Sequence, residues 1–140
     1  MGVPGERAED LSRFEVSIEV GHEHIDGLGH VNNVVYLGWM QQAATAHWDR
    51  VSDSASRAAV RWVVIRHEID YKAPAFVGER LLARTWVGEP TAATWERFSE
   101  IRRASDDQLL AQCRSVYVAL DPVSGRPRRV DAALRAPFGR

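Results

Sequence analysis

The sequence is poor in cysteine, in net charge and in long apolar runs. Cys113 is the only cysteine in 140 residues, which excludes an internal disulfide and favours a reducing compartment, so we expect the protein to be cytoplasmic. The formal net charge is only -1, so no overall positive field attracts nucleic acid. No apolar run has the length of a signal peptide or a membrane span. We therefore expect neither nucleic acid nor a membrane as a partner.

Several common catalytic motifs are also missing. The sequence has no Gly-x-Ser-x-Gly turn, which argues against a serine hydrolase. It has no glycine-rich phosphate loop, which argues against a nucleotide-dependent enzyme. Cys113 lies in an apolar segment without an activating neighbour, so we predict a core residue rather than a nucleophile.

The segment from Ile25 to Trp48 is the most informative part of the chain. No Asp, Glu, Lys or Arg occurs between Asn33 and His47, and the composition predicts a helix from about Asn32 to about Arg50. Apolar residues occupy nearly every side of this helix, which is typical of a helix buried by its neighbours. The polar, glycine-rich residues just before it bring a carboxylate and an imidazole to the helix N-terminus, where backbone N–H groups are free.

The rest of the chain predicts a strand before this helix and four strands after it. Alternation of apolar and polar residues marks the first strand, and β-branched and aromatic residues bounded by turns mark the others. The predicted strands cover residues 14–20, 61–72, 79–89, 92–103 and 109–120. We expect a polar loop at 52–56, a short helix capped by Asp131, a flexible tail at 1–12 and a single domain at 13–140, because no repeat or linker is present.

The order of one strand, a helix and four strands resembles the hot-dog fold of acyl-CoA thioesterases. In this α+β fold, an antiparallel five-stranded sheet wraps round one long central helix. Two motifs carry the resemblance to the 4-hydroxybenzoyl-CoA thioesterase-like branch. They read Asp26-x-x-Gly29-His30-Val31-Asn32-Asn33-x-x-Tyr36-Leu37-x-Trp39 and Asp70-Tyr71-x-x-Pro74-x-x-x-Gly78-Glu79-x-Leu81.

The resemblance implies a site for thioester hydrolysis that needs no metal or organic cofactor. Asp26 is the implied catalytic carboxylate, acting as a nucleophile or as a general base, and the backbone N–H of Asn33 is the group that polarises the carbonyl. Relatives often carry two Glu where this helix has Gln41 and Gln42, so a helix glutamate is not the catalyst here. The implied substrate-binding residues of the two motifs are Gly29, His30, Asn32, Tyr36, Tyr71 and Pro74.

Each of these residues also has a simpler interpretation. Asp26 could shape a loop, and His30 and Asn32 could cap the helix. His22, His24 and Asp26, with His30 nearby, also have a spacing that suits metal ligands, because residues two apart on a strand share a face. We predict no metal site.

The phosphates of CoA need basic partners at the mouth of the site. Arg126, Arg128 and Arg129, which follow the last predicted strand, are the favoured candidates, and Arg102 and Arg103 are alternatives. A five-stranded sheet also has two edges and only one long helix to cover it, so we expect a homodimer or homotetramer.

The predicted function is hydrolysis of an acyl-CoA thioester to a free carboxylic acid and CoA. Two alternatives stay open at this point. One is a non-catalytic hot-dog protein that binds acyl groups or serves as a scaffold, since a fold does not determine a function. The other is a thioesterase that acts on acyl carrier protein.

Overall fold

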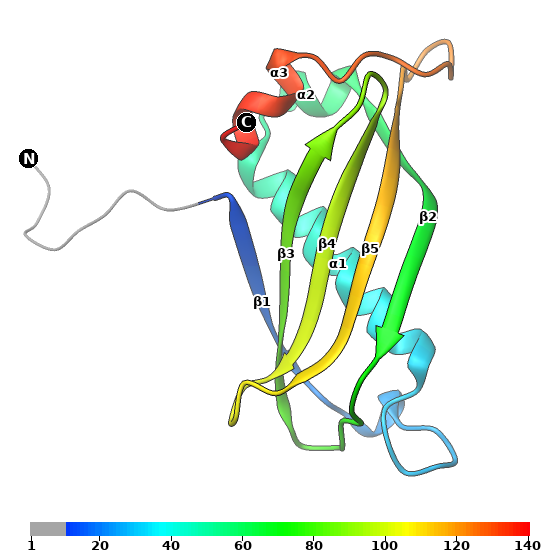
Figure 1. Cartoon of the computed structure of the whole chain (residues 1–140), viewed down its shortest axis with the longest axis vertical. Coiled ribbons are helices and arrows are strands. Elements are labelled where there is room, and N and C mark those ends of the chain that lie inside the picture. The colour runs from blue at the N-terminus through cyan, green and yellow to red at the C-terminus, as the bar shows by residue number, and fades with distance from the viewer. Residues whose placement is uncertain (1–10) are drawn as a thin grey trace, which may run out of the picture.

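A five-stranded antiparallel sheet covers one long helix in the computed structural model, which describes residues 11–140 (Figure 1). The helix α1 (Asn33–Val51) crosses one face of the sheet diagonally. The strands are β1 (Arg13–Glu19), β2 (Arg61–Tyr71), β3 (Arg80–Pro90), β4 (Thr94–Arg103) and β5 (Leu109–Leu120), in the spatial order β1-β3-β4-β5-β2. The predicted α+β hot-dog architecture is confirmed. Most of the predicted tail at 1–12 lies outside the described residues.

The sheet has one buried and one partly solvated face because its strands alternate in the expected way. In β4, Trp95, Ser99 and Ile101 are buried, whereas Glu96 and Glu100 between them are partly exposed. Buried side chains of α1 and of the strands form one apolar cluster around Trp39 and Met40. A second cluster contains Trp95 and Phe138, near the C-terminal end of α1.

The expectation that α1 is buried on all sides is wrong for the single chain. Val34 is 76% exposed, and Gly38, Gln41, Gln42 and Thr45 are also exposed. The reason is geometric, because one sheet covers only one side of a helix. The exposed side is nevertheless free of Asp, Glu, Lys and Arg from Asn33 to His47.

Short helices occur where capping residues precede helix-forming sequence. Asn32 is the N-cap of α1, so the helix begins at Asn33, one residue later than predicted. The expected loop at 52–56 instead begins α2 (Ser54–Ala59), because the Asp53 side chain accepts a hydrogen bond from the N–H of Ser56 at 2.8 Å. Near the C-terminus, the predicted cap at Asp131 is confirmed at the start of α3 (Ala132–Arg135), which continues into a 3-10 turn, η2 (Ala136–Phe138).

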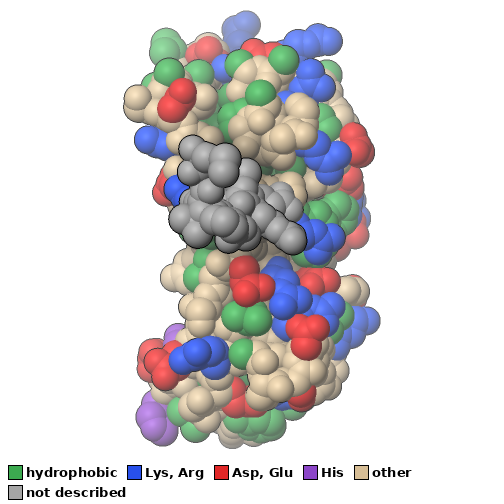
Figure 2. All heavy atoms as spheres, turned by 90° about the vertical axis from the view of Figure 1, so that its left-hand side faces the viewer, with side chains coloured by type: hydrophobic (Ala, Val, Ile, Leu, Met, Phe, Trp, Pro, Cys, Tyr) green, Lys and Arg blue, Asp and Glu red, His purple; other side chains and the backbone are tan. Residues whose placement is uncertain are grey.

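The two edge strands differ in character. On β1, Glu15, Ser17 and Glu19 are exposed, and the face on this side of the molecule mixes acidic and basic side chains where the view shows them (Figure 2). On β2, the exposed residues include Val63 and Ile65, and Ile65 is 60% exposed at a break in the pairing with β5. The edge with exposed aliphatic side chains is therefore β2, on which Arg61, Arg66, Glu68 and Asp70 are exposed as well. Within residues 11–140, no helix is both long and apolar enough to cross a membrane.

Candidate active site

A tight hairpin leads directly into α1. Ile25 and Val31 form a β-bridge, and the N–H of Asn32 donates to the carbonyl oxygen of His24 at 2.9 Å. At the tip, the N–H of Asp26 donates to the carbonyl oxygen of His30 at 3.1 Å. Gly29 has a φ of +86°, which favours glycine. The hairpin therefore holds Asp26 and His30 opposite each other, a few residues before the helix starts.

The Asp26 carboxylate is half-buried at the hairpin tip. Its Oδ1 accepts a hydrogen bond from the N–H of Leu28 at 2.8 Å, which orients the side chain. No hydrogen bond from a described residue reaches Oδ2. One carboxylate oxygen is thus fixed while the other is free to act on a substrate or a water molecule.

The first N–H groups of α1 differ in how they are used. The N–H of Val34 donates to the Asn32 side chain, and the N–H of Val35 donates to the Asn32 carbonyl oxygen, each at 3.0 Å. Asn32 is therefore a helix cap, as the simpler interpretation of this residue predicted. The N–H of Asn33 has no acceptor among the described residues. A free donor thus lies at the positive end of the helix dipole.

Two tyrosines fix this helix start to the sheet. The Tyr71 hydroxyl, at the end of β2, donates to the carbonyl oxygen of Asn33 at 3.0 Å. The Tyr36 ring packs against the rings of both Tyr71 and Trp39. Burial raises the pKa of both tyrosines, so each hydroxyl keeps its proton at neutral pH. The structure therefore brings Tyr36 and Asn33 of the first motif together with Tyr71 of the second.

Replacing Tyr71 with Phe tests this anchor, because it removes only the hydroxyl. We expect the free energy of unfolding to fall by about 1 kcal/mol, the usual net value of one hydrogen bond. Chemical denaturation measures this loss. A variant as stable as the wild type would show that the bond to Asn33 does not hold the helix start.

The loop of the second motif holds the Asp26 hairpin in place through hydrogen bonds. The N–H of Val31 donates to the carbonyl oxygen of Ala75 at 2.9 Å. The loop containing Ala75 is closed by Glu79, whose carboxylate accepts the N–H of Phe76 at 2.7 Å and pairs with Arg103. Gly78 has a φ of +85° in the same loop. Pro74 is exposed, and its carbonyl oxygen accepts from Arg103 at 3.0 Å. These contacts make the motif a support for the Asp26 hairpin.

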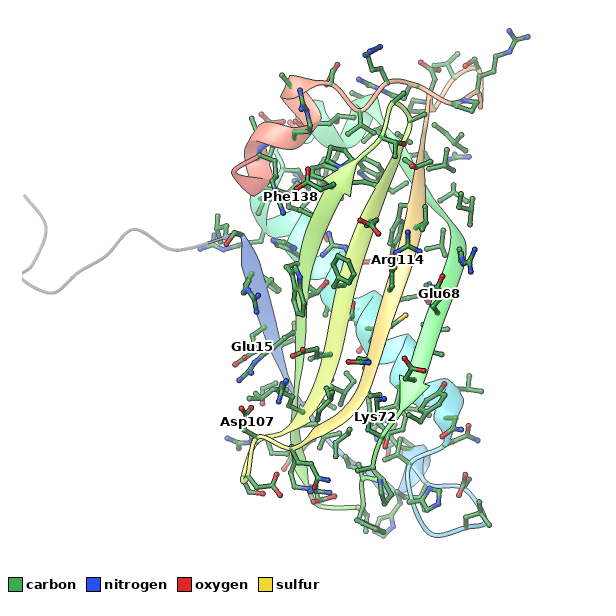
Figure 3. All side chains as sticks on the ribbon, viewed as in Figure 1. Glu15, Glu68, Lys72, Asp107, Arg114 and Phe138 are labelled. Carbon is green, nitrogen blue, oxygen red and sulfur yellow. The ribbon has the colours of Figure 1, made fainter. Side chains whose placement is uncertain are left out.

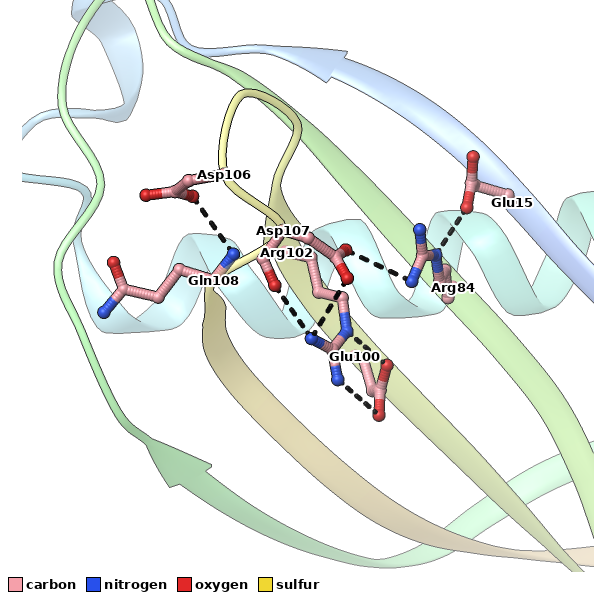
Figure 4. Close-up of polar contacts among 7 residues, drawn as sticks. All are labelled: Glu15, Arg84, Glu100, Arg102, Asp106, Asp107 and Gln108. Carbon is pink, nitrogen blue, oxygen red and sulfur yellow. Dashed lines mark hydrogen bonds and ion pairs between the residues drawn. The ribbon is translucent and has the colours of Figure 1, made fainter.

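Arg102 and Arg103 are already engaged by other groups. Arg102 pairs with Glu100 at 2.9 Å and donates to the carbonyl oxygen of Asp107, within a network that extends to Arg84 and Glu15 (Figure 4). Arg103 pairs with Glu79 and with Asp106. Both guanidinium groups therefore serve the structure of the sheet end, which disfavours them as ligands of CoA phosphates.

The favoured arginines lie far from Asp26 within one chain. They follow β5 at the end of the sheet opposite to the hairpin (Figure 1). Arg128 pairs with Asp131 at 2.9 Å and donates to the carbonyl oxygen of Ala59 at 2.7 Å, so it fixes the C-terminal segment. Arg126 and Arg129 are exposed. The single chain does not bring these residues together with Asp26.

The histidines near the hairpin have individual contacts. His24 accepts the N–H of Gly21 on its Nδ1 at 2.9 Å, and its ring packs edge-on against Trp39. The His30 ring is half-buried, with its Nδ1 at 3.5 Å from the carbonyl oxygen of Val31. Across residues 11–140, no three His, Cys, Asp or Glu side chains are grouped so that they could hold a metal ion.

Cys113 is buried, as predicted, next to a histidine and a serine. Its Sγ lies 3.9 Å from His67 Nδ1 and 3.5 Å from Ser115 Oγ. Burial raises the pKa of the Cys113 thiol and lowers that of His67. The thiol is therefore protonated at neutral pH, which argues against a nucleophilic cysteine.

A buried polar group at the other end of the molecule was not predicted from the sequence. Arg97 is buried between α1 and the sheet, beside His47. The available signal was its position in β4, because Arg97 alternates with Glu96 and Phe98 and so shares the inward face of Trp95. A charged residue in an inward position is uncommon and marks a site worth examining.

Comparison with known proteins adds a family match to this geometry. Residues 20–138 match the family model described as the thioesterase-like superfamily. The long-chain acyl-CoA thioesterase FadM of Escherichia coli K12 is 23% identical over 127 residues, which cover 87% of this chain and 94% of that enzyme.

Solved structures share the fold over nearly the whole chain. A 1,4-dihydroxy-2-naphthoyl-CoA thioesterase from Synechocystis superposes with a TM-score of 0.79 at 21% identity, covering 91% of this chain and 96% of that one. A Thermus thermophilus thioesterase complexed with coenzyme A and Zn gives a TM-score of 0.79 at 25% identity, covering 91% of this chain and 98% of that one.

Proposed function

The chain belongs to the thioesterase-like superfamily, and from this membership we propose that it hydrolyses an acyl-CoA thioester to a free carboxylic acid and CoA. The observation that carries the proposal is local. A half-buried carboxylate with one free oxygen, on Asp26, precedes a helix whose first N–H, on Asn33, has no acceptor among the described residues. Hydrolysis of a thioester uses a carboxylate that attacks the carbonyl carbon or activates water, and a donor that stabilises the carbonyl oxygen.

The start of α1 stabilises the negative charge that develops on the thioester carbonyl oxygen. The thioester carbonyl oxygen gains negative charge as the carbonyl carbon becomes tetrahedral. The Asn33 N–H, at the positive end of the α1 dipole, donates a hydrogen bond to that oxygen. Because Asn32 and Tyr71 hold this turn in place, the donor needs no rearrangement during the reaction.

Asp26 either activates the water that attacks the carbonyl carbon or attacks this carbon itself, and both routes fit its position. As a general base, Asp26 removes a proton from water while the water oxygen bonds to the carbonyl carbon. As a nucleophile, it forms an acyl-aspartyl anhydride that water then hydrolyses. In both routes the carbon–sulfur bond breaks, the CoA thiolate leaves and takes up a proton, and the acid is released. The fixed Oδ1 and free Oδ2 of Asp26 suit either route.

Release of free thiol from a panel of acyl-CoAs tests the proposed function. We expect turnover of at least part of a panel that spans short, long and aromatic acyl groups. Binding of acyl-CoA without thiol release would favour the non-catalytic alternative. Turnover of acyl carrier protein thioesters in preference to every acyl-CoA would favour the second alternative.

The assembly that we propose is a homodimer in which the β2 edges of two subunits pair, or a tetramer built from such dimers. The exposed aliphatic side chains of Val63 and Ile65 on β2 support this arrangement, and so does the uncharged exposed side of α1 around Val34 and Gly38. Gly38 has open space around its Cα, so a second helix could approach closely. For the compartment we propose the cytoplasm, because the single cysteine is a free, buried thiol.

Arg126 and Arg129 are the residues that we propose for the CoA phosphates. Strands paired edge to edge about a two-fold axis run antiparallel, so the C-terminal segment of one subunit lies toward the Asp26 end of the other. Exposed guanidinium groups there can pair with phosphate oxygens. Arg128 is less suitable because it already binds Asp131 and the Ala59 carbonyl oxygen.

Replacing Arg126 and Arg129 together with Ala, while keeping Arg128, should raise KM for acyl-CoA severalfold and leave kcat nearly unchanged. This pattern is the signature of lost uniform binding. Steady-state kinetics on acyl-CoA and on a short thioester that lacks the nucleotide provide the measurement. The short thioester is the control and should be hydrolysed as before. An unchanged KM for acyl-CoA would remove both arginines from the binding site.

A further inference from the structure

A cavity of about 240 Å³ lies at the end of the molecule opposite to the Asp26 hairpin. Five aromatic side chains line it together with polar ones, among them Thr45, Arg97 and Glu96, whose carboxylate pairs with Arg114. The residues that matter here are Trp48, Trp62, Trp95, Phe138, Arg97 and Tyr117. Figure 3 shows Phe138 at this end and Lys72, which directly follows β2, toward the other. The cavity is smaller than the roughly 300–1,000 Å³ of sites for drug-sized ligands, which favours a short ligand group.

Arg97 is a buried cation without a carboxylate partner in residues 11–140. It is only 7% exposed, and its Nη1 donates to His47 Nδ1 and to Thr85 Oγ1, each at 2.9 Å. Neither partner carries negative charge. No carboxylate of the described residues forms an ion pair with Arg97, although an isolated buried charge is costly.

His47 is neutral in this arrangement. Its Nε2 donates to the carbonyl oxygen of Leu11 at 2.6 Å, which leaves Nδ1 as the acceptor for Arg97. Burial lowers the pKa of His47 to about 4, so the imidazole ring carries no charge at neutral pH. Burial also lowers the pKa of Arg97, to about 10, and the guanidinium keeps its charge.

Three N–H donors of Arg97 remain, on Nε and on Nη2. None of them has an acceptor among the described residues. Within the described part of the chain, the only buried side-chain nitrogen or oxygen that is both unpaired and sealed from solvent is Arg135 Nε. The free donors of Arg97 are therefore not sealed from solvent, and Arg97 is one of the residues that line the cavity. Tyr117 adds a hydroxyl that has no partner in residues 11–140.

We propose that this cavity receives the far end of the acyl group and that Arg97 binds a carboxylate there, so that the substrate is the CoA thioester of a short dicarboxylic acid. The proposal rests on the proposed function and names its substrate class. A carboxylate accepts two parallel hydrogen bonds from the Nε and Nη2 donors of a guanidinium. It also supplies the missing counterion, while the tryptophan walls cover the apolar part of the chain.

The acyl group reaches this cavity across the subunit boundary. Along α1, about 15 residues separate Asn33 from Trp48, or roughly 22 Å, so the cavity is distant from Asp26 of its own chain. In the β2-paired dimer the two strands run antiparallel. The Tyr71 end of β2, which is bonded to Asn33, then lies toward the Trp62 end of the partner strand. One subunit thus supplies Asp26 and the other supplies Arg97.

The test compares octanedioyl-CoA with octanoyl-CoA, which have the same chain length and differ in the terminal carboxylate. We expect the wild type to show a kcat/KM at least about tenfold higher for octanedioyl-CoA, the effect of one charge-assisted contact. Arg97→Met should reduce this preference at least tenfold while octanoyl-CoA is still hydrolysed. Arg97→Lys should restore part of it, because the charge returns without the fork of donors.

Tyr117→Phe tests the same subsite if substitution of the buried Arg97 prevents folding. It removes only a hydroxyl and should lower the preference for octanedioyl-CoA severalfold without a change in thermal stability. Binding of free octanedioate, measured by quenching of tryptophan fluorescence, gives a readout that needs no catalysis and should be lost in Arg97→Met.

The outcomes separate this proposal from the proposed function. If neither thioester is hydrolysed but octanedioate binds through Arg97, the carboxylate subsite stands and the enzymatic function fails. If both thioesters are hydrolysed with equal kcat/KM in the wild type and in every Arg97 variant, the subsite is wrong and the enzymatic function stands.

Discussion

Replacing Asp26 with Asn is expected to lower kcat for acyl-CoA hydrolysis by about a hundredfold or more. The change keeps the size of the side chain and its hydrogen bond from the N–H of Leu28, but it removes the negative charge. An amide can neither attack the carbonyl carbon nor take a proton from water, so the loss falls on the transition state. Rates of thiol release under saturating substrate provide the measurement, and the melting temperature should be unchanged.

Glu23 offers a matched control for Asp26. It is an exposed carboxylate three residues earlier, in the 3-10 turn η1 (His22–His24) that leads into the same hairpin. Glu23→Gln makes the same chemical change and should leave kcat within about twofold of the wild type. If Asp26→Asn retains activity within about threefold, the assignment of Asp26 as the catalytic carboxylate is wrong.

Lysines introduced on the β2 edge are expected to separate the subunits and abolish most of the activity. Val63→Lys combined with Ile65→Lys places two positive charges on this edge strand, and the same charges arrive on the partner. Charged edges resist pairing with another strand. Because both residues are already exposed in the single chain, the fold should tolerate the change. Light scattering measures the mass, and thiol release measures the activity.

The opposite edge supplies the control for the β2 variant. Ser17→Lys adds the same side chain to β1, whose exposed residues already include Glu15 and Glu19. We expect this variant to keep the mass and the activity of the wild type. If the wild type or the variant with both lysines on β2 is an active monomer at micromolar concentration, both the dimer and the active site shared between its subunits are wrong.

Most of the secondary structure followed from patterns that act over a few residues. Alternation predicted β1, and β-branched and aromatic residues bounded by turns predicted the other four strands. The strand β5 begins and ends where it was expected. Asp131 was recognised as a cap because its side chain bonds to a backbone group only three residues away. Asp53 has the same geometry and was overlooked, so the loop predicted at 52–56 is in fact the start of a helix.

The candidate site was only partly predictable. The motif around Asp26 identified a hairpin followed by a helix, and Asn32 and Asn33 stand at the start of that helix as expected. Tyr71 and Pro74 of the second motif were predicted to contact substrate, and the structure shows that Glu79 and Pro74 also make contacts that close a supporting loop. Substrate contacts by Gly29, His30, Asn32, Tyr36, Tyr71 and Pro74 stay predictions. A motif states which residues occur together, but not which of them face a ligand.

The sequence by itself determined the element types, their order and the position of the Asp26 hairpin before α1, because propensity, alternation and capping are local. The tertiary structure decided which distant residues meet. Tyr71 bonds to Asn33 across 38 positions, and Arg97 bonds to His47 across 50. Such contacts depend on strand order and register, which no short window of sequence contains. The same packing left one side of α1 uncovered and placed the buried guanidinium of Arg97 beside a cavity with several aromatic side chains.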